Sequence, residues 1–265
     1  MRRFAFTLVE LLVVLAIIAL VMGLLIPALH LAKLQAKTVV CSSNIRQILN
    51  LLTIYEQQNG GFPFGFNDMD LMGKYPGVPS DGDKRGKWWF QYIGYELKNT
   101  EVKNSSIFWC PSRGIKDPTS KPNILCGNYG VNRAICKDVN SMSGIIGSEY
   151  VGIPLSLSNI PHPESVLLVV DSGYSLISWQ GVTNADVIPF DGMARGRDTS
   201  FYVPGVKINI QRGLNKEDAI AGRHINKTVN VGYADGHARR IKAEELFVYE
   251  ENGVYTNLQT WVPKK

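Results

Sequence analysis

The sequence predicts an α+β chain: one long N-terminal helix whose second half packs against an antiparallel β-sheet head domain. Three observations predict this fold. An apolar run, LLVVLAIIALVMGLLIPAL, lies close to the N-terminus, a helical stripe of apolar residues follows it, and short apolar or alternating segments occur nearer the C-terminus. With 265 residues, 45% of them hydrophobic, the chain is large enough for one head domain of ordinary size beyond the helix.

The apolar run predicts a membrane-spanning helix over residues 6–29, long enough to cross a hydrocarbon core of roughly 30 Å. A basic leader, residues 1–5, precedes it, and Arg2 and Arg3 predict a cytoplasmic N-terminus with the rest of the chain exported. An ordinary secretory signal carries its small-residue cleavage site after the apolar core. Here the small residue, Ala5, lies before the core, so cleavage at this junction would leave the helix on the mature chain.

Glu10 is the only charged residue in this segment. A carboxylate near the centre of a membrane helix costs about 2.5 to 3.5 kcal/mol on insertion scales, so such a residue usually has a partner and a function. Cleavage after Ala5 would create an amine on Phe6, about one helical turn before Glu10, that can neutralise it within the chain or in a neighbouring subunit. The alternative is that Glu10 lies at the membrane interface of an uncleaved signal anchor.

The helix is expected to continue beyond the membrane over residues 30–58, giving a length of roughly 80 Å from Phe6. Pro27 supplies a local reason for a bend, because it lacks an N–H and its ring clashes with the preceding turn. The sequence around Gly60 and Pro63 ends the helix. Docking on the head is favoured over a coiled coil because the exported strands need a covering helix. The apolar stripe that predicts docking comprises Leu31, Leu34, Thr38, Cys41, Ile45, Ile48, Leu52 and Tyr55.

Residues 59–265 are expected to form the head domain. The segment SVLLVVDS, residues 165–172, predicts a buried strand, and VNVGYADGHARRI, residues 229–241, predicts a hairpin with a type I′ turn at Asp235 and Gly236. An aromatic segment near residue 90 is expected to be a short helix or strand that fills the core, with carbohydrate stacking as the alternative. Its aromatic residues are Trp88, Trp89, Phe90 and Tyr92.

The N-terminal segment AFTLVE followed by the apolar run resembles the N-terminus of type IV pilins and type II secretion pseudopilins. The resemblance implies a pilin-like fold, cleavage by a prepilin peptidase between Ala5 and Phe6, and methylation of the new amine. It also implies that Glu10 recruits the next subunit into a helical filament. Ala5 departs from the usual glycine before the cleavage site, and Pro27 lies where such proteins often carry a helix-bending proline.

Four segments of the exported region resemble a large subgroup of pseudopilin-like proteins. The C-terminal one combines Arg223 and His224 with the sequence ADGH at residues 234–237, and resembles the closing His and Asp-Gly-His signature of that subgroup. Ten residues separate His224 from Asp235, one more than the pattern has. The other three segments are CSSNIRQI at residues 41–48, FWCPS at residues 108–112 and NYGVN at residues 128–132.

All four cysteines lie beyond the membrane segment, in a compartment expected to be oxidising. Cys126 and Cys136 would close a short loop, which leaves Cys41 to pair with Cys110 by elimination. Zinc is the rival interpretation, and the lack of a C-x-x-C spacing argues against it.

Candidate metal ligands are His224, Asp235 and His237, although turn chemistry and structural hydrogen bonding explain these residues as well. A structural calcium site using Asp191 or Asp198 is a weaker expectation, because calcium prefers oxygen ligands on irregular loops. The sequence contains no nucleophile elbow, phosphate-binding loop or dinucleotide fingerprint, so no enzyme is expected. The net charge of +5 becomes +3 without Arg2 and Arg3, which is too mild to indicate a nucleic-acid partner.

These observations together predict a structural filament subunit of a type II secretion or type IV pilus-like system, held in the inner membrane by a single span. Its expected partners are a prepilin peptidase and other pilin or pseudopilin subunits. One alternative is a membrane-anchored exported module that binds a glycan or another surface ligand. A further alternative is an anchored metal-dependent enzyme centred on His224 and His237.

Overall fold

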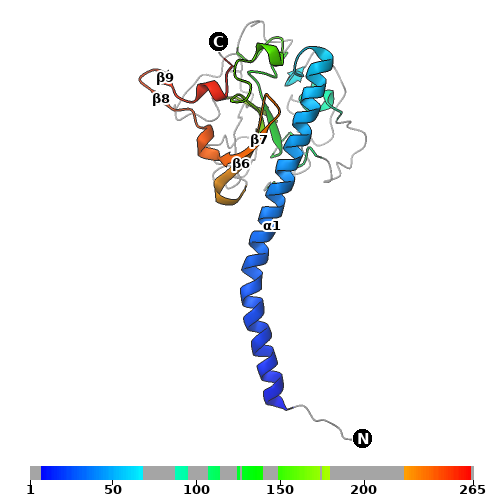
Figure 1. Cartoon of the computed structure of the whole chain (residues 1–265), viewed down its shortest axis with the longest axis vertical. Coiled ribbons are helices and arrows are strands. Elements are labelled where there is room, and N and C mark those ends of the chain that lie inside the picture. The colour runs from blue at the N-terminus through cyan, green and yellow to red at the C-terminus, as the bar shows by residue number, and fades with distance from the viewer. Residues whose placement is uncertain are drawn as a thin grey trace, which may run out of the picture.

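A long helix that projects from a β-sheet head dominates the structure (Figure 1). The structure is a computed structural model and describes residues 7–67, 87–94, 107–113, 124–125, 127–139, 149–173, 175–179 and 224–263. Helix α1 spans Leu8–Asn59 and has Thr7 as its N-cap. Gly60 ends it in a left-handed conformation with φ 72°, which glycine adopts without steric cost. The helix and sheet confirm the predicted α+β class, with a long helix beginning near residue 6 and ending near residue 58.

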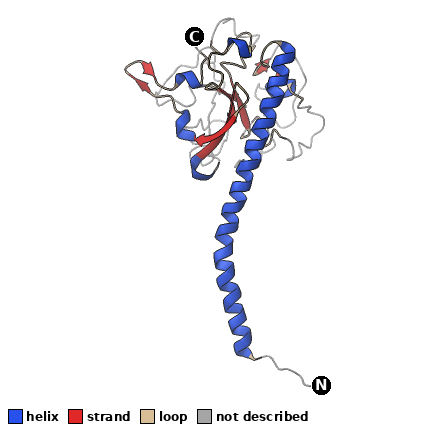
Figure 2. Ribbon diagram, in the orientation of Figure 1, coloured by secondary structure: helices blue, strands red, loops and turns tan. Residues whose placement is uncertain are grey.

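The head is built on a five-stranded mixed sheet with strand order β5-β3-β4-β6-β7. Figure 2 shows strands of the head beside the C-terminal half of the long helix. Three pairings are antiparallel, and β5 pairs with β3 in parallel. The strands are β3 (Tyr129–Asn132), β4 (Leu167–Asp171), β5 (Leu176–Ile177), β6 (Thr228–Tyr233) and β7 (Ala238–Lys242).

Strand β4 is the centre of the sheet and confirms the buried strand predicted over residues 165–172. All five of its residues are buried. Its two faces belong to different cores, because Leu168 and Val169 pack with α1 whereas Leu167 and Val170 pack with the C-terminal segment. A strand that is covered on both faces has no solvent side, which explains why four apolar residues run together before Asp171.

Shorter elements close the head around this sheet. Trp261 is fully buried in the second core and donates its indole N–H to the carbonyl of Leu246 at 3.0 Å. The remaining strands and the short α-helix are β1 (Phe66–Asn67), β2 (Lys87–Trp88), α2 (Trp89–Tyr92), β8 (Glu250–Glu251) and β9 (Val254–Tyr255). Four 3₁₀ helices are described: η1 (Leu157–Asn159), η4 (Ile225–Lys227), η5 (Ala243–Leu246) and η6 (Leu258–Thr260).

The aromatic segment near residue 90 is part of the core, as predicted. Trp88, Trp89 and Phe90 are buried, and Trp89 donates its indole N–H to the carbonyl of Ser175 at 3.0 Å. These buried rings belong to the same core cluster as the docked half of α1, so they are not presented to a carbohydrate.

The second half of α1 docks on the sheet, where it contacts β4, β6 and β7. The docked face differs from the predicted stripe at its ends: Leu31 is 54% exposed, and Leu34 and Tyr55 are only half-buried. The buried residues of the helix are Thr38, Cys41, Asn44, Ile45, Ile48, Leu49 and Leu52. Asn44 and Leu49 widen the buried face, so the helix presents a broad stripe to the sheet.

Pro27 lies inside α1, which continues through it as one element. The helix curves gently along its length and shows no sharp kink (Figure 1). The amide that Pro27 lacks would have bonded to the carbonyl of Gly23, so one helical hydrogen bond is absent there.

The hairpin β6–β7 is confirmed, but the predicted type I′ turn is wrong. A type I′ turn needs a positive φ at both central residues, and here only Gly236 has one, at φ 94°. The amide of Gly236 donates to the carbonyl of Tyr233 at 3.0 Å, and the amide of Tyr233 donates to the carbonyl of His237 at 2.9 Å. A three-residue loop with one left-handed glycine therefore connects the strands.

Tight packing of Leu49 of α1 over Gly232 of β6 predicts a compensating pair of substitutions. A Cβ atom on Gly232 of β6 would lie 2.7 Å from a methyl group of Leu49. Leu49→Ala should lower the free energy of unfolding by about 2–5 kcal/mol through the cavity it leaves. Gly232→Ala should lower it by about 1–3 kcal/mol through overpacking. The double variant should lose less than the sum, because Leu49→Ala removes the two contacts with Leu49 and leaves only the contact with Cγ1 of Val169 at 2.8 Å.

Urea unfolding of the detergent-solubilised chain, followed by tryptophan fluorescence, measures these free energies. Ile54→Ala is the control, because Ile54 lies on the same helix and is 49% exposed. Strict additivity of Leu49→Ala and Gly232→Ala would contradict the packing described here.

Candidate functional sites

The N-terminus of α1 is closed by a reciprocal capping box. The backbone N–H and the hydroxyl of Thr7 each donate to Oε2 of Glu10 at 2.8 Å. In return, the amide of Glu10 donates to the Thr7 hydroxyl at 3.3 Å. The carboxylate is thereby fixed at the positive end of the helix dipole. Glu10 is exposed, so its remaining acceptor capacity is open to a cationic group from a neighbouring chain.

The first half of α1 forms an apolar surface that has no partner among the residues that the structure describes. Every residue from Leu8 to Lys33 is exposed, including Leu8 at 78% and Leu24 at 73%. The helix is long and apolar enough to cross a membrane. In water such a surface would be strongly unfavourable, so it requires lipid or other apolar helices around it.

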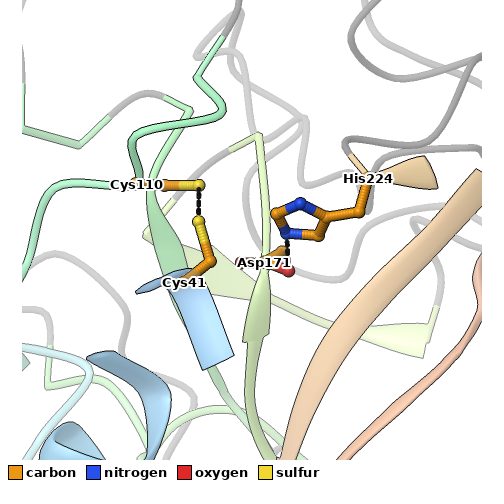
Figure 3. A group of neighbouring side chains, drawn as sticks. All are labelled: Cys41, Cys110, Asp171 and His224. Atoms are coloured by element: carbon orange, nitrogen blue, oxygen red, sulfur yellow. Dashed lines mark hydrogen bonds and ion pairs between the residues drawn. The ribbon is translucent and has the colours of Figure 1, made fainter. Parts of the chain in front are cut away.

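A second polar constellation lies inside the head, where four chain segments meet (Figure 3). Cys41 comes from α1, Cys110 from the turn at residues 107–110, Asp171 from the end of β4, and His224 from the residue before η4. One ligand atom from each residue lies within 4.8 Å of all the others, and all four residues are buried. The Sγ atoms of Cys41 and Cys110 are 2.6 Å apart.

Asp171 accepts three hydrogen bonds at one carboxylate oxygen. Its Oδ2 lies 2.7 Å from Nε2 of His224, and it accepts from the amide of Asn230 at 2.7 Å and from its side-chain Nδ2 at 2.9 Å. The side chains of His224 and Asp171 are both fully buried. Strand β6 therefore fixes the carboxylate through Asn230, and the carboxylate in turn orients the imidazole.

The cluster has the electrostatics of an ion-pair network. Burial lowers the pKa of His224, but the charge of Asp171 and its hydrogen bond outweigh burial and raise the pKa to about 9. Burial raises the pKa of Cys41, but hydrogen bonds from Cys110 and His224 outweigh it and lower the pKa to about 6. The Cys41 thiolate is thus the favoured form beside a histidine cation.

Further hydrogen bonds join the segments that carry this cluster. Asn44 donates to the carbonyl of Trp109 at 3.2 Å and to the hydroxyl of Tyr129 at 3.1 Å. The amide of Cys110 donates to Oδ1 of Asn128 at 3.1 Å. The four segments that the sequence singled out for their resemblance therefore contribute residues to one place in the head.

Comparison with known families identifies a motif in the N-terminal segment. Residues 1–26 match the prokaryotic N-terminal methylation motif. Neither the curated proteins nor the solved structures contain a match to this chain.

The methylation motif covers most of the exposed first half of α1. It supports a prepilin-type, pilin-like N-terminus that is processed by a prepilin peptidase and assembles with other pilin subunits. Proteins with this motif are structural subunits. The motif and the apolar helix together fit a membrane-anchored single-pass protein. Thr7 and Glu10 lie within the motif and are joined in the capping box, whereas Ala5 and Phe6 lie outside the residues that the structure describes.

The predicted metal set of His224, Asp235 and His237 is wrong as a group. Nδ1 of His237 lies 2.6 Å from Oδ1 of Asp235 at the β6–β7 turn, and both side chains are partly exposed. His224 lies near the opposite end of β6, ahead of its first residue Thr228, and contacts Asp171 instead. The strand that separates them is six residues long, so the three side chains cannot share one ion. Asp191 and Asp198, suggested for calcium, lie outside the described residues.

Neither predicted disulfide is present among the described residues: Cys41, Cys110 and Cys136 are free cysteines, and Cys126 lies outside the residues that the structure describes. Elimination correctly placed Cys41 beside Cys110, but the same pocket holds His224 and Asp171, which the prediction did not include. Asp171 and Asn230 were missed altogether. The sequence signal for Asp171 was its position directly after four buried apolar residues of β4, where a carboxylate needs a partner.

Proposed function

We propose that this chain is a prepilin-processed structural subunit of a filament that belongs to a type II secretion or type IV pilus-like system. The observation that carries the proposal is the exposed apolar half of α1, within a methylation motif and with one carboxylate at its N-terminal end. Residues 1–5 act as the leader, residues 6–29 span the inner membrane, and residues 30–58 continue into the head formed by residues 59–265. Arg2 and Arg3 keep the N-terminus cytoplasmic.

Assembly exchanges lipid contacts of α1 for contacts with the same surface of other subunits. Packing and hydrogen bonding rather than water exclusion stabilise helix association in lipid, so a specific polar pair has a large influence on register. Glu10 supplies the acceptor, and the Phe6 amine of a neighbouring subunit supplies the cation. The head decorates the filament and has no catalytic role in this proposal.

Photo-crosslinking in intact cells tests this function. A photoreactive residue at Ile18, which is 45% exposed on the first half of α1, should give a ladder of crosslinked multimers. The ladder should disappear in cells that lack the prepilin peptidase, because the uncleaved chain has no Phe6 amine. A chain that stays monomeric at Ile18 in cells with an active peptidase would instead favour a membrane-anchored binding module.

A further inference from the structure

The buried cluster in the head has the composition of a transition-metal site. It offers two sulfurs, one imidazole nitrogen and one carboxylate oxygen, all mutually within 4.8 Å. Two cysteines and a histidine select zinc among the common divalent ions, and four ligands suit its tetrahedral coordination. The ligands come from four distant segments, so their arrangement has no C-x-x-C signature.

Unsatisfied polar atoms provide a second, independent indication of a ligand. Within the described part of the chain, Oδ1 of Asp171 and Nδ1 of His224 are buried and have no hydrogen-bond partner. Leaving such groups unsatisfied in a protein interior destabilises the fold, and more strongly when the groups are charged. A bound metal ion would compensate the carboxylate directly and would take the lone pair that the imidazole offers once it has lost a proton.

We propose that Cys41, Cys110, His224 and Asp171 together bind one zinc ion. This inference goes beyond the proposed filament role and does not depend on it. A disulfide between the two cysteines would use the sulfurs alone and would leave the histidine and the aspartate buried with their unsatisfied atoms. Zinc uses all four groups.

The geometry requires a small adjustment of the two cysteines. Two sulfurs bound tetrahedrally at about 2.3 Å from zinc lie about 3.8 Å from each other. The present separation of 2.6 Å must therefore increase by about one ångström, which rotation of the cysteine side chains about χ1 can provide. With Cys41 already a thiolate beside the His224 cation, binding releases one proton from the Cys110 thiol and one from the His224 imidazolium to solvent as the Zn–S and Zn–N bonds form.

The proposed zinc ion has a structural consequence for the head. It would connect α1 to the turn carrying Cys110, to the end of β4, and to the segment before β6. These connections hold the docked half of α1 on the sheet, so metal binding contributes to head stability as structural zinc sites do.

Metal analysis of the full chain, extracted in detergent without chelators, tests the proposal. We expect about one zinc per chain in the wild type. Cys41→Ser and His224→Ala should lose most of the zinc. Cys136→Ser and His237→Ala should retain it, because Cys136 is a buried thiol outside the cluster and His237 lies at the β6–β7 turn. Asn230→Ala should weaken zinc affinity about 10–100-fold, because Asn230 holds Asp171 in place.

A second measurement on the wild type does not depend on how well the variants fold. Replacing the metal with cobalt should give the intense absorption of thiolate-to-cobalt charge transfer together with the visible bands of tetrahedral cobalt. Wild-type protein that is free of metal and yields a Cys41–Cys110 crosslink on non-reducing peptide mapping would overturn the proposal. Full zinc content in Cys41→Ser would overturn it as well.

Discussion

Glu10→Ala should insert into the membrane as well as the wild type and yet fail to enter filaments. Removing a carboxylate lowers the cost of transferring the helix into lipid, so insertion is preserved or improved. The Phe6 amine of a neighbouring subunit then lacks its counter-charge in a low-dielectric setting, where charge pairs are strongest. Loss of about 1.4 kcal/mol already changes an equilibrium tenfold, so we expect incorporation beside wild-type subunits to fall about tenfold or more.

Glu10→Gln separates this charge effect from the capping box. An amide oxygen still accepts hydrogen bonds from Thr7, so glutamine keeps the helix cap while removing the charge. The proposed function requires that Glu10→Gln fail nearly as severely as Glu10→Ala. The measurement is the amount of each variant in sheared filaments divided by its amount in the membrane. A wild-type ratio for Glu10→Gln would show that Glu10 acts only as a cap.

The largest effect on stability is expected at the buried ion pair between Arg133 and Asp138. Nη2 of Arg133 contacts Oδ2 of Asp138, and the two side chains are only 1% and 3% exposed. The guanidinium also lies over the ring of Tyr150, 5.2 Å from its centroid. Asp138→Ala removes the carboxylate and leaves a buried cation, which costs about 3–5 kcal/mol. That is a large fraction of the roughly 5–15 kcal/mol that stabilises an ordinary domain.

An exposed ion pair gives the matched control. Nζ of Lys242 lies 3.3 Å from Oε1 of Glu244, and both side chains are 64% exposed. Solvent screens this pair, so Glu244→Ala should change the free energy of unfolding by at most about 0.5 kcal/mol. Urea unfolding of the detergent-solubilised chain compares the two variants. Similar losses for Asp138→Ala and Glu244→Ala would refute the assignment of Arg133 and Asp138 as a structural pair.

Much of the fold could be predicted because periodic patterns encode local structure. The spacing of Cys41, Ile45, Ile48 and Leu52 predicted the docked face of α1, and all four residues are buried. The exposure of Leu31 was not predictable, because periodicity does not reveal where the sheet ends. The turn type at Gly236 was also missed, since Asp-Gly suits both two-residue and longer hairpin loops.

The two candidate sites differ in how far sequence could reveal them. Thr7 and Glu10 are three residues apart, so a local motif contains their whole geometry. Cys41 and Cys110 are 69 residues apart, and Asp171 and His224 are 53 apart. No local spacing rule relates such residues. Only the docking of α1 on β4 and β6 brings them together. The prediction from sequence therefore grouped His224 with His237, which lies in the same C-terminal segment.

The N-terminal mass of the chain extracted from membranes tests the central claim most directly. Ala5 is small enough to precede a cleavage site, and the methylation motif spans the junction with Phe6. We therefore predict loss of Met1 to Ala5 and one added methyl group on the Phe6 amine. An intact Met1 in cells with an active prepilin peptidase would contradict the account, because the uncleaved chain has no Phe6 amine to pair with Glu10.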